Sequence, residues 1–293
     1  MRALHWLACC LAVLLLAACS ATRLAYDHLD TLVRWQASDY IDMTATQRQD
    51  FNAELYGLWS WHRSSQLPLY AADLKQLADE VQAGPLSLQQ LDAAGARITE
   101  HWNSLIAQAM PGYARLHADL SDAQVADMVR RIDRQIEHKS RKRQKQSEAQ
   151  RREHSADEMD DMLHDWIGRP NPAQHLLVEQ WAAREPGATQ EQEQIKDQET
   201  QASLDRYAAL LATRTQPGFE QRIGAFILAP EAPAQRARVE AEQQRWLQLL
   251  ADVSATLEPS QREHLRQRLL DYAADFDALA AEEPPQNPDG AGS

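Results

Sequence analysis

This sequence has few cysteines and few glycines, and its basic side chains are not in surplus over the acidic ones. Of its 293 residues only 3 are cysteine and 10 are glycine, while 44% are apolar. These proportions exclude a collagen-like, disulfide-stapled or wholly disordered chain, and they allow one or two globular domains with a real core. The 43 acidic side chains outnumber the 30 basic ones, for a formal net charge of -13. Phosphate recognition depends on a surplus of lysine and arginine, so this balance predicts no nucleic acid among the partners.

The first twenty residues have the features of an export signal. Arg2 is followed by an uncharged run from Leu7 to Ala18 that is too short to cross about 30 Å of hydrocarbon as a helix. This pattern is typical of a signal peptide. The run ends in Leu16-Ala17-Ala18-Cys19, which resembles the lipobox of bacterial lipoproteins. The resemblance implies a lipid-modified Cys19, palmitate included, and cleavage before it. The alternatives are a simple secretory peptide with an accidental cysteine, or an uncleaved anchor.

Lipidation would decide both the chemistry and the location of the chain. Cys9 and Cys10 would leave with the signal peptide and Cys19 would be consumed by lipid, so disulfides, thiolate nucleophiles and thiolate metal sites are not expected. One acyl chain attaches a protein marginally, whereas two or more hold it firmly. In lipoproteins of enterobacterial type an Asp after the cysteine favours the inner membrane. Ser20 stands there, which implies the outer membrane, facing the periplasm.

The remainder of the chain has helical periodicity. Apolar residues recur three or four positions apart, as in Phe51, Leu55 and Leu58, and no segment alternates with period two over any length. The sequence therefore predicts an all-α, elongated multi-helix bundle. Its organisation is expected to be a signal peptide over 1–18, a helical body over 19–281 with a weak boundary near Gly168, and a disordered tail over 282–293.

Several expected helix starts share one arrangement, in which a capping side chain stands three residues before a glutamine. This is the capping box, or its asparagine analogue, at Thr44-x-x-Gln47, Ser87-x-x-Gln90, Ser121-x-x-Gln124 and Asn171-x-x-Gln174. Four segments also resemble the Leu-Thr-x-x-Gln element of small periplasmic stress chaperones, which bind unfolded clients. Three are the boxes at Thr44, Ser87 and Ser121, each with an apolar residue before it, and the fourth is Leu257-Glu258-x-x-Gln261. No copy is a strict match, and a capping box alone generates the pattern.

A basic stretch interrupts the acidic chain. Between Glu137 and Arg152 the basic side chains exceed the acidic ones, and no apolar residue larger than alanine occurs between Ile136 and Met159. We expect a solvated segment, with a long basic helix running through residues 122–167. Its candidate role is contact with anionic lipid, lipopolysaccharide or an acidic partner, and the alternative is a solvated face that binds nothing in particular. The residues concerned are Lys139, Arg141, Lys142, Arg143, Lys145, Arg151 and Arg152.

Candidate catalytic and metal sites are few. Asp157, Asp161 and His164 share one helix face at a spacing that suits a divalent metal, although a generally acidic solvated face is the simpler interpretation. A second set, Asp39, Asp42 and His62, could supply acid and base groups if the first helices pack together, but buried polar groups that fix helix register are the simpler interpretation. No phosphate-cradling glycine loop, G-x-S-x-G or H-E-x-x-H motif is present. We therefore expect neither an enzyme nor a cofactor or metal.

A family resemblance extends over nearly the whole chain after residue 22. It is carried by Arg23-Leu24-x-Tyr26, Leu29-Asp30, Trp35, Asp39-Tyr40-x-Asp42, Gln47-Arg48, Trp59-x-Trp61-His62-Arg63, Gln66-Leu67-Pro68-x-Tyr70, Leu120-Ser121-Asp122-x-Gln124, Trp166-Ile167-Gly168, Gln180-Trp181 and Gln261-Arg262-x-His264-Leu265. In these positions the chain resembles a family of uncharacterised proteobacterial lipoproteins known as a domain of unknown function. The resemblance implies a lipidated cysteine and a helical periplasmic body, and it implies no activity.

The large aromatic residues complete the sequence-based predictions. Their spacing indicates packing first, with four in five expected to be at least half-buried: Trp59, Trp61, Trp102, Trp166, Trp181 and Trp246. A secondary hypothesis is an apolar binding face made of Trp59, Trp61 and Tyr70. The predicted function is a non-enzymatic scaffold or interaction protein of the cell envelope, and the alternative is a chaperone-like binder of unfolded or outer-membrane-bound clients.

Overall fold

The computed structural model describes residues 22–184, 189–228 and 233–282. The predicted signal peptide, Cys19 and residues 283–293 of the predicted tail lie outside the described residues. Within the described ranges the secondary structure is helical with no strand, which confirms the all-α prediction. The elements are α2 (Leu29–Tyr40), α3 (Ala45–Trp61), the π-helix η1 (His62–Gln66), α4 (Leu67–Ala83), α5 (Leu88–Asp119), α6 (Asp122–Gln144), α7 (Glu148–Ile167), α8 (Pro172–Ala182), α9 (Gln190–Leu211), α10 (Phe219–Leu228), α11 (Pro233–Ala255) and α12 (Pro259–Ala281).

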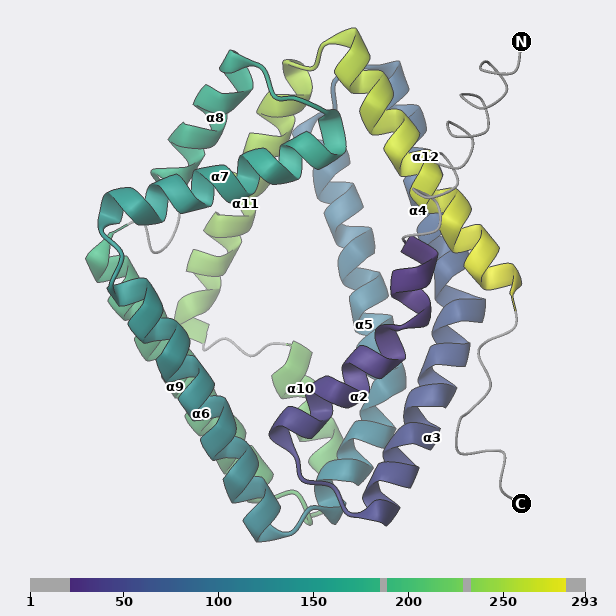
Figure 1. Cartoon of the computed structure of the whole chain (residues 1–293), viewed down its shortest axis with the longest axis vertical. Helices are drawn as coiled ribbons and strands as arrows, with labels where there is room; N and C mark the ends of the chain where they lie inside the picture. Colours follow the sequence, from purple (N-terminus) through teal and green to yellow (C-terminus); the bar gives the residue numbers. More distant parts are fainter. Residues whose placement is uncertain (1–21, 185–188, 229–232, 283–293) are drawn as a thin grey trace, which may run out of the picture.

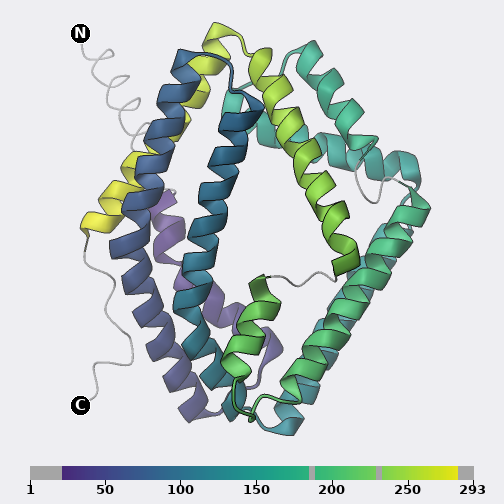
Figure 2. The ribbon, with the colours of Figure 1, turned by 180° about the vertical axis from the view of Figure 1, so that it is seen from behind.

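The helices are arranged as a four-sided frame (Figure 1). One side is the antiparallel pair α6 and α9, and the opposite side contains the rod of α3, η1 and α4 together with α5. Helices α7, α8 and α11 close one end, where α12 packs along α4. Seen from behind, the last turns of α11 lie near the first turns of α5, and the two helices diverge away from this end (Figure 2). None of the described helices is long and apolar enough to cross a bilayer.

The buried apolar residues form four clusters at different places around this frame. One joins α5, α6, α9 and α10 around Met110, Met128 and Leu211, and a second joins α7, α8 and α11 around Leu163 and Val178. A third lies among α4, α5, α11 and α12, and a fourth, smaller one packs Tyr26, Leu67 and Leu279 together. Because each cluster involves only a few helices, the frame has several small cores rather than one large one.

The predicted helix starts are confirmed. The side chains of Thr44, Ser87, Ser121 and Asn171 each accept a hydrogen bond from the backbone N–H of the glutamine three residues later. The side-chain oxygen of each glutamine in turn accepts one from the backbone N–H of the cap residue. These bonds satisfy N–H groups that have no partner inside the helix. Two further capping boxes, at Ser147 and Thr189, were not predicted.

The single helix expected over residues 122–167 is two helices in the structure. The chain turns at residues 145–147, so the span 122–167 forms α6 and α7 and the prediction of one continuous basic helix was wrong. The physical reason is the capping box in which Ser147 accepts from Gln150 N–H at 3.2 Å, which starts a new helix there. Gly168 ends α7 with a φ of 75°, a left-handed conformation that suits glycine, at the predicted weak boundary.

The rod of α3 and α4 changes its hydrogen-bond register at η1. Pro68 has no backbone N–H and cannot continue the ladder, and Leu67 N–H bonds to His62 O one residue further back than in an α-helix. The wider turn buries Arg63, whose Nε donates to Leu279 O of α12 at 2.6 Å. Its Nη2 also lies 3.0 Å from the carboxylate of Glu282.

Candidate functional site

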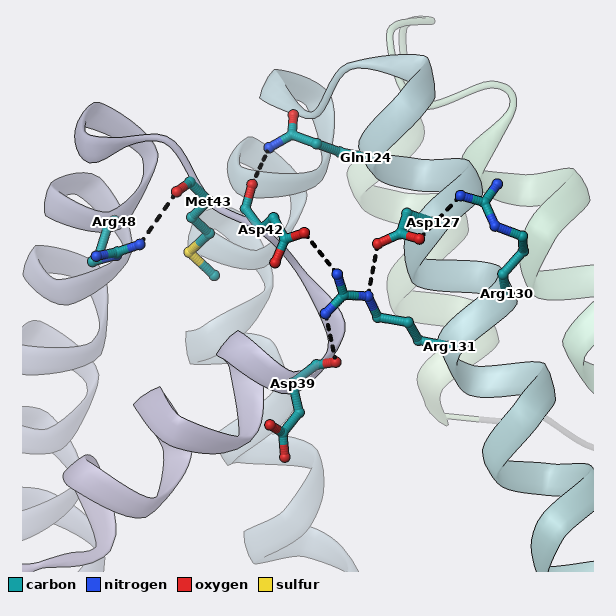
Figure 3. Close-up of polar contacts among 8 residues, drawn as sticks. All are labelled: Asp39, Asp42, Met43, Arg48, Gln124, Asp127, Arg130 and Arg131. Atoms are coloured by element: carbon teal, nitrogen blue, oxygen red, sulfur yellow. Dashed lines mark hydrogen bonds and ion pairs between the residues drawn. The ribbon is translucent and has the colours of Figure 1, made fainter.

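The first polar cluster connects α2 to α6 through Arg131 (Figure 3). The guanidinium of Arg131 donates to Asp42 Oδ2 at 2.6 Å and to the backbone oxygen of Asp39 at 3.2 Å. It also bonds to Asp127 Oδ2 at 2.7 Å on its own helix, and this hydrogen bond lowers the pKa of the Asp127 carboxyl. Arg131 therefore fixes the chain between α2 and α3 against α6.

The structure does not bring Asp39 and Asp42 to His62. Asp39 and Asp42 both precede the start of α3, whereas His62 follows its last residue, and the 17 residues of α3 separate them by about 25 Å. The prediction that the three could share acid and base chemistry was wrong. Helix α3 runs straight between them, and the carboxylate of Asp42 is held by Arg131 instead (Figure 3).

Two of the capping glutamines pair with each other across α3 and α6. Gln124 Nε2 donates to Gln47 Oε1 at 2.8 Å, and Gln47 Nε2 lies 3.4 Å from Gln124 Oε1. Gln47 also donates to Asp119 O and Gln124 to Asp42 O, both at 2.8 Å. We call this pair joint A. Each glutamine therefore caps its own helix and holds the backbone in front of the partner helix.

The same arrangement recurs between α8 and α12, where Gln174 and Gln261 form joint B. Their amide groups bond reciprocally, both distances being 2.9 Å, and they are 0% and 6% exposed. Gln174 also donates to Thr256 O at 3.3 Å and Gln261 to Arg169 O at 3.0 Å. In both joints the accepting carbonyl lies two residues before the partner's cap. The Leu-Thr-x-x-Gln-like elements therefore connect helices distant in sequence, except the one at Ser87, whose glutamine bonds within its own box.

The predicted apolar face lies in an aromatic and histidine cluster around η1. Trp59 stacks at 4.7 Å from the ring of Tyr26, whose hydroxyl lies 2.8 Å from Nδ1 of His62. Tyr70 contacts His62 at 5.4 Å and His101 at 4.6 Å between ring centroids. Burial lowers the pKa of His62. Trp59 and Tyr70 both lie in this cluster, where their rings contact neighbouring side chains of the same chain, and a binding role for this face stays a prediction. Trp61, half-buried, lies 6.5 Å from His62.

A histidine and a carboxylate do meet at the edge of this cluster. Asp73 of α4 lies 2.6 Å from Nε2 of His101 and 3.0 Å from Nε of Arg97, both on α5. The carboxylate is therefore shared between two cationic or hydrogen-donating groups, and it ties α4 to α5. The sequence analysis did not single out this pair, because its residues are 28 positions apart with no distinguishing motif.

A second buried polar network was also missed. The hydroxyls of Tyr113 and Tyr207 lie 2.8 Å apart, and that of Tyr207 lies 3.2 Å from Nε2 of His117. His117 is 2% exposed, and burial lowers its pKa while burial raises the pKa of Tyr207. This network joins α5 to α9, and no local sequence signal reports a contact across 90 or more residues.

The basic stretch is divided between internal and exposed residues. Arg143 contacts Glu193 of α9, which is 2% exposed, and its Nη2 lies 2.7 Å from Asp197. Arg151 is buried and donates to Gln146 O at 2.5 Å. The expectation of a solvated segment was therefore wrong for these two residues. The acidic helix α9 packs against α6 beside Arg143, and Arg151 is buried near the start of α7. Arg141 and Arg152 pair with acids one turn away on their own helices.

Lys139, Lys142 and Lys145 of the basic stretch are exposed. Their contact with anionic lipid or an acidic partner stays a prediction. Asp157, Asp161 and His164 are likewise exposed on α7. Among the described residues, no group of three or more His, Cys, Asp or Glu side chains is arranged to hold a metal ion.

Helices α3 and α5 enclose a groove of about 660 Å³, with Val33 of α2 at its edge. Its floor includes Phe51, Leu58 and Leu116, and acidic residues stand among its lining. The side chain of Glu54 lies against Gly112 of α5, where a Cβ atom would lie 2.7 Å from its carboxylate oxygen. The lining residues of this groove were not predicted to form a site.

The middle of α5 carries exposed apolar residues. Leu91 near the start of α5 and Met110 toward its end are buried in two different cores, at 8% and 7% exposed. Ile98 and Trp102, which lie between them, are 68% and 51% exposed. Ile98 and Trp102 share the face of Leu91, because residues three, four and seven apart align on a helix. Helix α11 covers this face at Leu91 and diverges from α5 beyond it (Figure 2). We call Ile98 and Trp102 the α5 stripe.

Of the six tryptophans expected to be packed, four are half-buried and two are not. Trp59, Trp61, Trp166 and Trp181 follow the prediction. Trp102 of the α5 stripe and Trp246 of α11, 39% exposed, depart from it. Their spacing is that of core residues, but the frame leaves the neighbouring position without a helix.

Comparison with known proteins gives one relationship. A family described as a family of unknown function (DUF6279) matches residues 39–237. The chain belongs to DUF6279. The DUF6279 region contains both glutamines of joint A, the basic stretch and the α5 stripe, and it ends before α12, so joint B combines one residue inside the region with one outside it. No curated protein and no solved structure matches the chain.

Proposed function

We propose that this DUF6279 protein is a lipid-anchored, non-enzymatic interaction protein of the proteobacterial envelope, which binds a partner protein through the α5 stripe. The lipobox-like sequence ending in Cys19 supports attachment to the outer membrane on the periplasmic side. The single observation that supports partner binding is the exposure of Ile98 and Trp102 between two well-packed cores.

A protein partner suits the α5 stripe because of its chemistry. Tryptophan is enriched at the centres of protein interfaces, where a large flat ring gains contact area at a small cost in conformational entropy. The exposed apolar pair also lies one turn apart on a straight helix, so a partner can cover both residues at once. A role without catalysis agrees with the polar clusters, whose residues bond to one another across helix contacts.

Site-specific crosslinking in intact cells tests this proposal. The photoreactive residue p-benzoylphenylalanine is placed at Trp102, and in a matched variant at Glu100, which is exposed on the opposite side of α5. We expect a discrete adduct from position 102 and not from position 100, with its partner identified by mass spectrometry. Equal adducts from both positions, or none from position 102, would contradict the proposed binding face.

Chaperone-like binding of unfolded clients is the second candidate, and the joints favour it. Three of the four Leu-Thr-x-x-Gln-like elements form helix junctions rather than isolated caps. The test is suppression of aggregation of a denatured client at modest stoichiometry. Trp102→Ser should weaken suppression, while Leu176→Ser, which changes an apolar residue of similar exposure on α8, should not. A scaffold with one defined partner would show no suppression in either form.

A further inference from the structure

Helix α2 and the short helical segment before it, residues 22–27, carry apolar residues on both their exposed and their covered sides. Leu24, Leu29, Leu32 and Trp35 are 59%, 37%, 50% and 60% exposed. Within α2, at about 100° per residue, Leu29, Leu32 and Trp35 fall within about 120° of each other, and Leu24 lies on the helical segment that a turn at His28 separates from α2. The other face carries Tyr26, which is 8% exposed, and Val33, which lines the groove.

Only one of these faces is covered by the described part of the protein. Helix α2 lies on a broad side of the frame, nearest the viewer in Figure 1 and farthest in Figure 2. Tyr26 and Val33 face the frame, so the row of Leu24, Leu29, Leu32 and Trp35 faces away from it. A helix that is apolar on both sides needs a second apolar surface.

The covalent chain specifies what that surface is. Cys19 precedes the first described residue, Thr22, by three peptide units, which span at most about 11 Å. A lipid on Cys19 lies in the bilayer, so the first helical turn is held within the headgroup region or next to it. Leu24 follows two residues later, and the exposed row then continues along the helix for about 16 Å to Trp35.

We infer that the exposed row of α2 lies in the membrane interface, with the phospholipid bilayer as its partner. This inference rests on the proposed lipid anchor at Cys19. If the helix stood upright on the membrane, only Leu24 would reach lipid, and the apolar residues at its far end would have no role. A helix lying flat inserts leucine and tryptophan side chains between headgroups. The frame is then held with one broad side against the membrane, and the α5 stripe is held at a fixed distance from it.

Trp35 is the natural probe, because it is the residue of the row farthest from Cys19. The full chain is expressed, recovered from membranes and reconstituted into phosphatidylethanolamine and phosphatidylglycerol vesicles, with and without brominated acyl chains. Bromine quenches tryptophan emission only at close range. We expect quenching in the wild-type protein that is largely lost in Trp35→Phe and retained in Trp102→Phe, which removes an equally exposed ring on α5. Leu32→Gln should also reduce the quenching while circular dichroism stays unchanged.

Several outcomes would overturn the inference. Quenching that is identical in the wild type and Trp35→Phe would show that α2 stands away from the bilayer. Shielding of Trp35 that appears without vesicles and rises with protein concentration would show that a second copy covers the row. The intact mass of the same preparation reports the thioether on Cys19 separately. Its absence would refute the proposed anchor, while the Trp35 measurement would still report the position of α2.

Discussion

Truncating Gln261 to alanine should destabilise the protein far more than truncating Gln90. Both glutamines occupy the third position of a capping box. The side chain of Gln261 takes part in four hydrogen bonds, two of them with Gln174 and one with the backbone of Arg169. The hydrogen bonds of Gln90 within the described residues all lie inside its own box, at a helix start where Ser87 is exposed.

The expected difference follows from burial. A hydrogen bond contributes about 1 kcal/mol net, and a buried polar group left without its partner costs about 1–3 kcal/mol. Gln174 is 0% exposed, so its amide cannot turn to water when Gln261 is removed. We therefore expect Gln261→Ala to lower the free energy of unfolding by about 3 kcal/mol and Gln90→Ala by about 1 kcal/mol.

Urea denaturation followed by circular dichroism measures both values. Adding Gln174→Ala to Gln261→Ala completes a double-mutant cycle, and the pair should cost less than the sum of its members by about 1–2 kcal/mol. The explanation fails if Gln261→Ala is no more harmful than Gln90→Ala. It also fails if the two joint substitutions add independently, because the reciprocal amide bonds would then contribute nothing specific.

Three other perturbations follow from named contacts. Arg143→Met leaves the carboxylate of Glu193 buried without its ion pair and should cost about 2 kcal/mol in urea denaturation, whereas the exposed neighbour Lys142→Met should cost almost nothing. Burial lowers the pKa of His117, so below about pH 6.5 the unfolded chain takes up a proton more readily and stability falls with acidity; His117→Asn should flatten this slope between pH 7.5 and 5. Arg131→Met should speed amide hydrogen exchange in α2 while α12 stays unchanged.

Local features of the fold could be predicted from the sequence because their physics is local. A helix start needs a side-chain acceptor for its free N–H groups, and Thr44 with Gln47 supplies one within four residues. The spacing of apolar side chains three or four residues apart, which indicates a helix, is likewise set within about one helical turn. The break between α6 and α7 at residues 145–147 has a local signal as well. Ser147 stands three residues before Gln150, which is the same capping-box arrangement as at Thr44 and Gln47.

The candidate sites depend on contacts that no local pattern specifies. Gln47 and Gln124 are 77 residues apart, and each looks like an ordinary capping residue until both helices are in place. The division of the basic stretch has the same origin, since Arg143 is half-buried and paired with Glu193 only because the acidic helix α9 returns beside α6. The exposure of Trp102 is equally non-local, because its spacing is that of a core residue.

The frame explains why exposed apolar residues and buried polar joints occur in the same protein. A helix in a frame has fewer neighbours than one in a compact bundle, so part of its apolar stripe, such as Ile98 and Trp102, has no helix to cover it. Small separate cores supply less hydrophobic stabilisation each, and the directional bonds of joints A and B hold the angles between helices that packing alone leaves loosely defined. Stability and binding capacity therefore reside in different residues. A partner or a membrane can cover the exposed rows without competing with the contacts that hold the frame together.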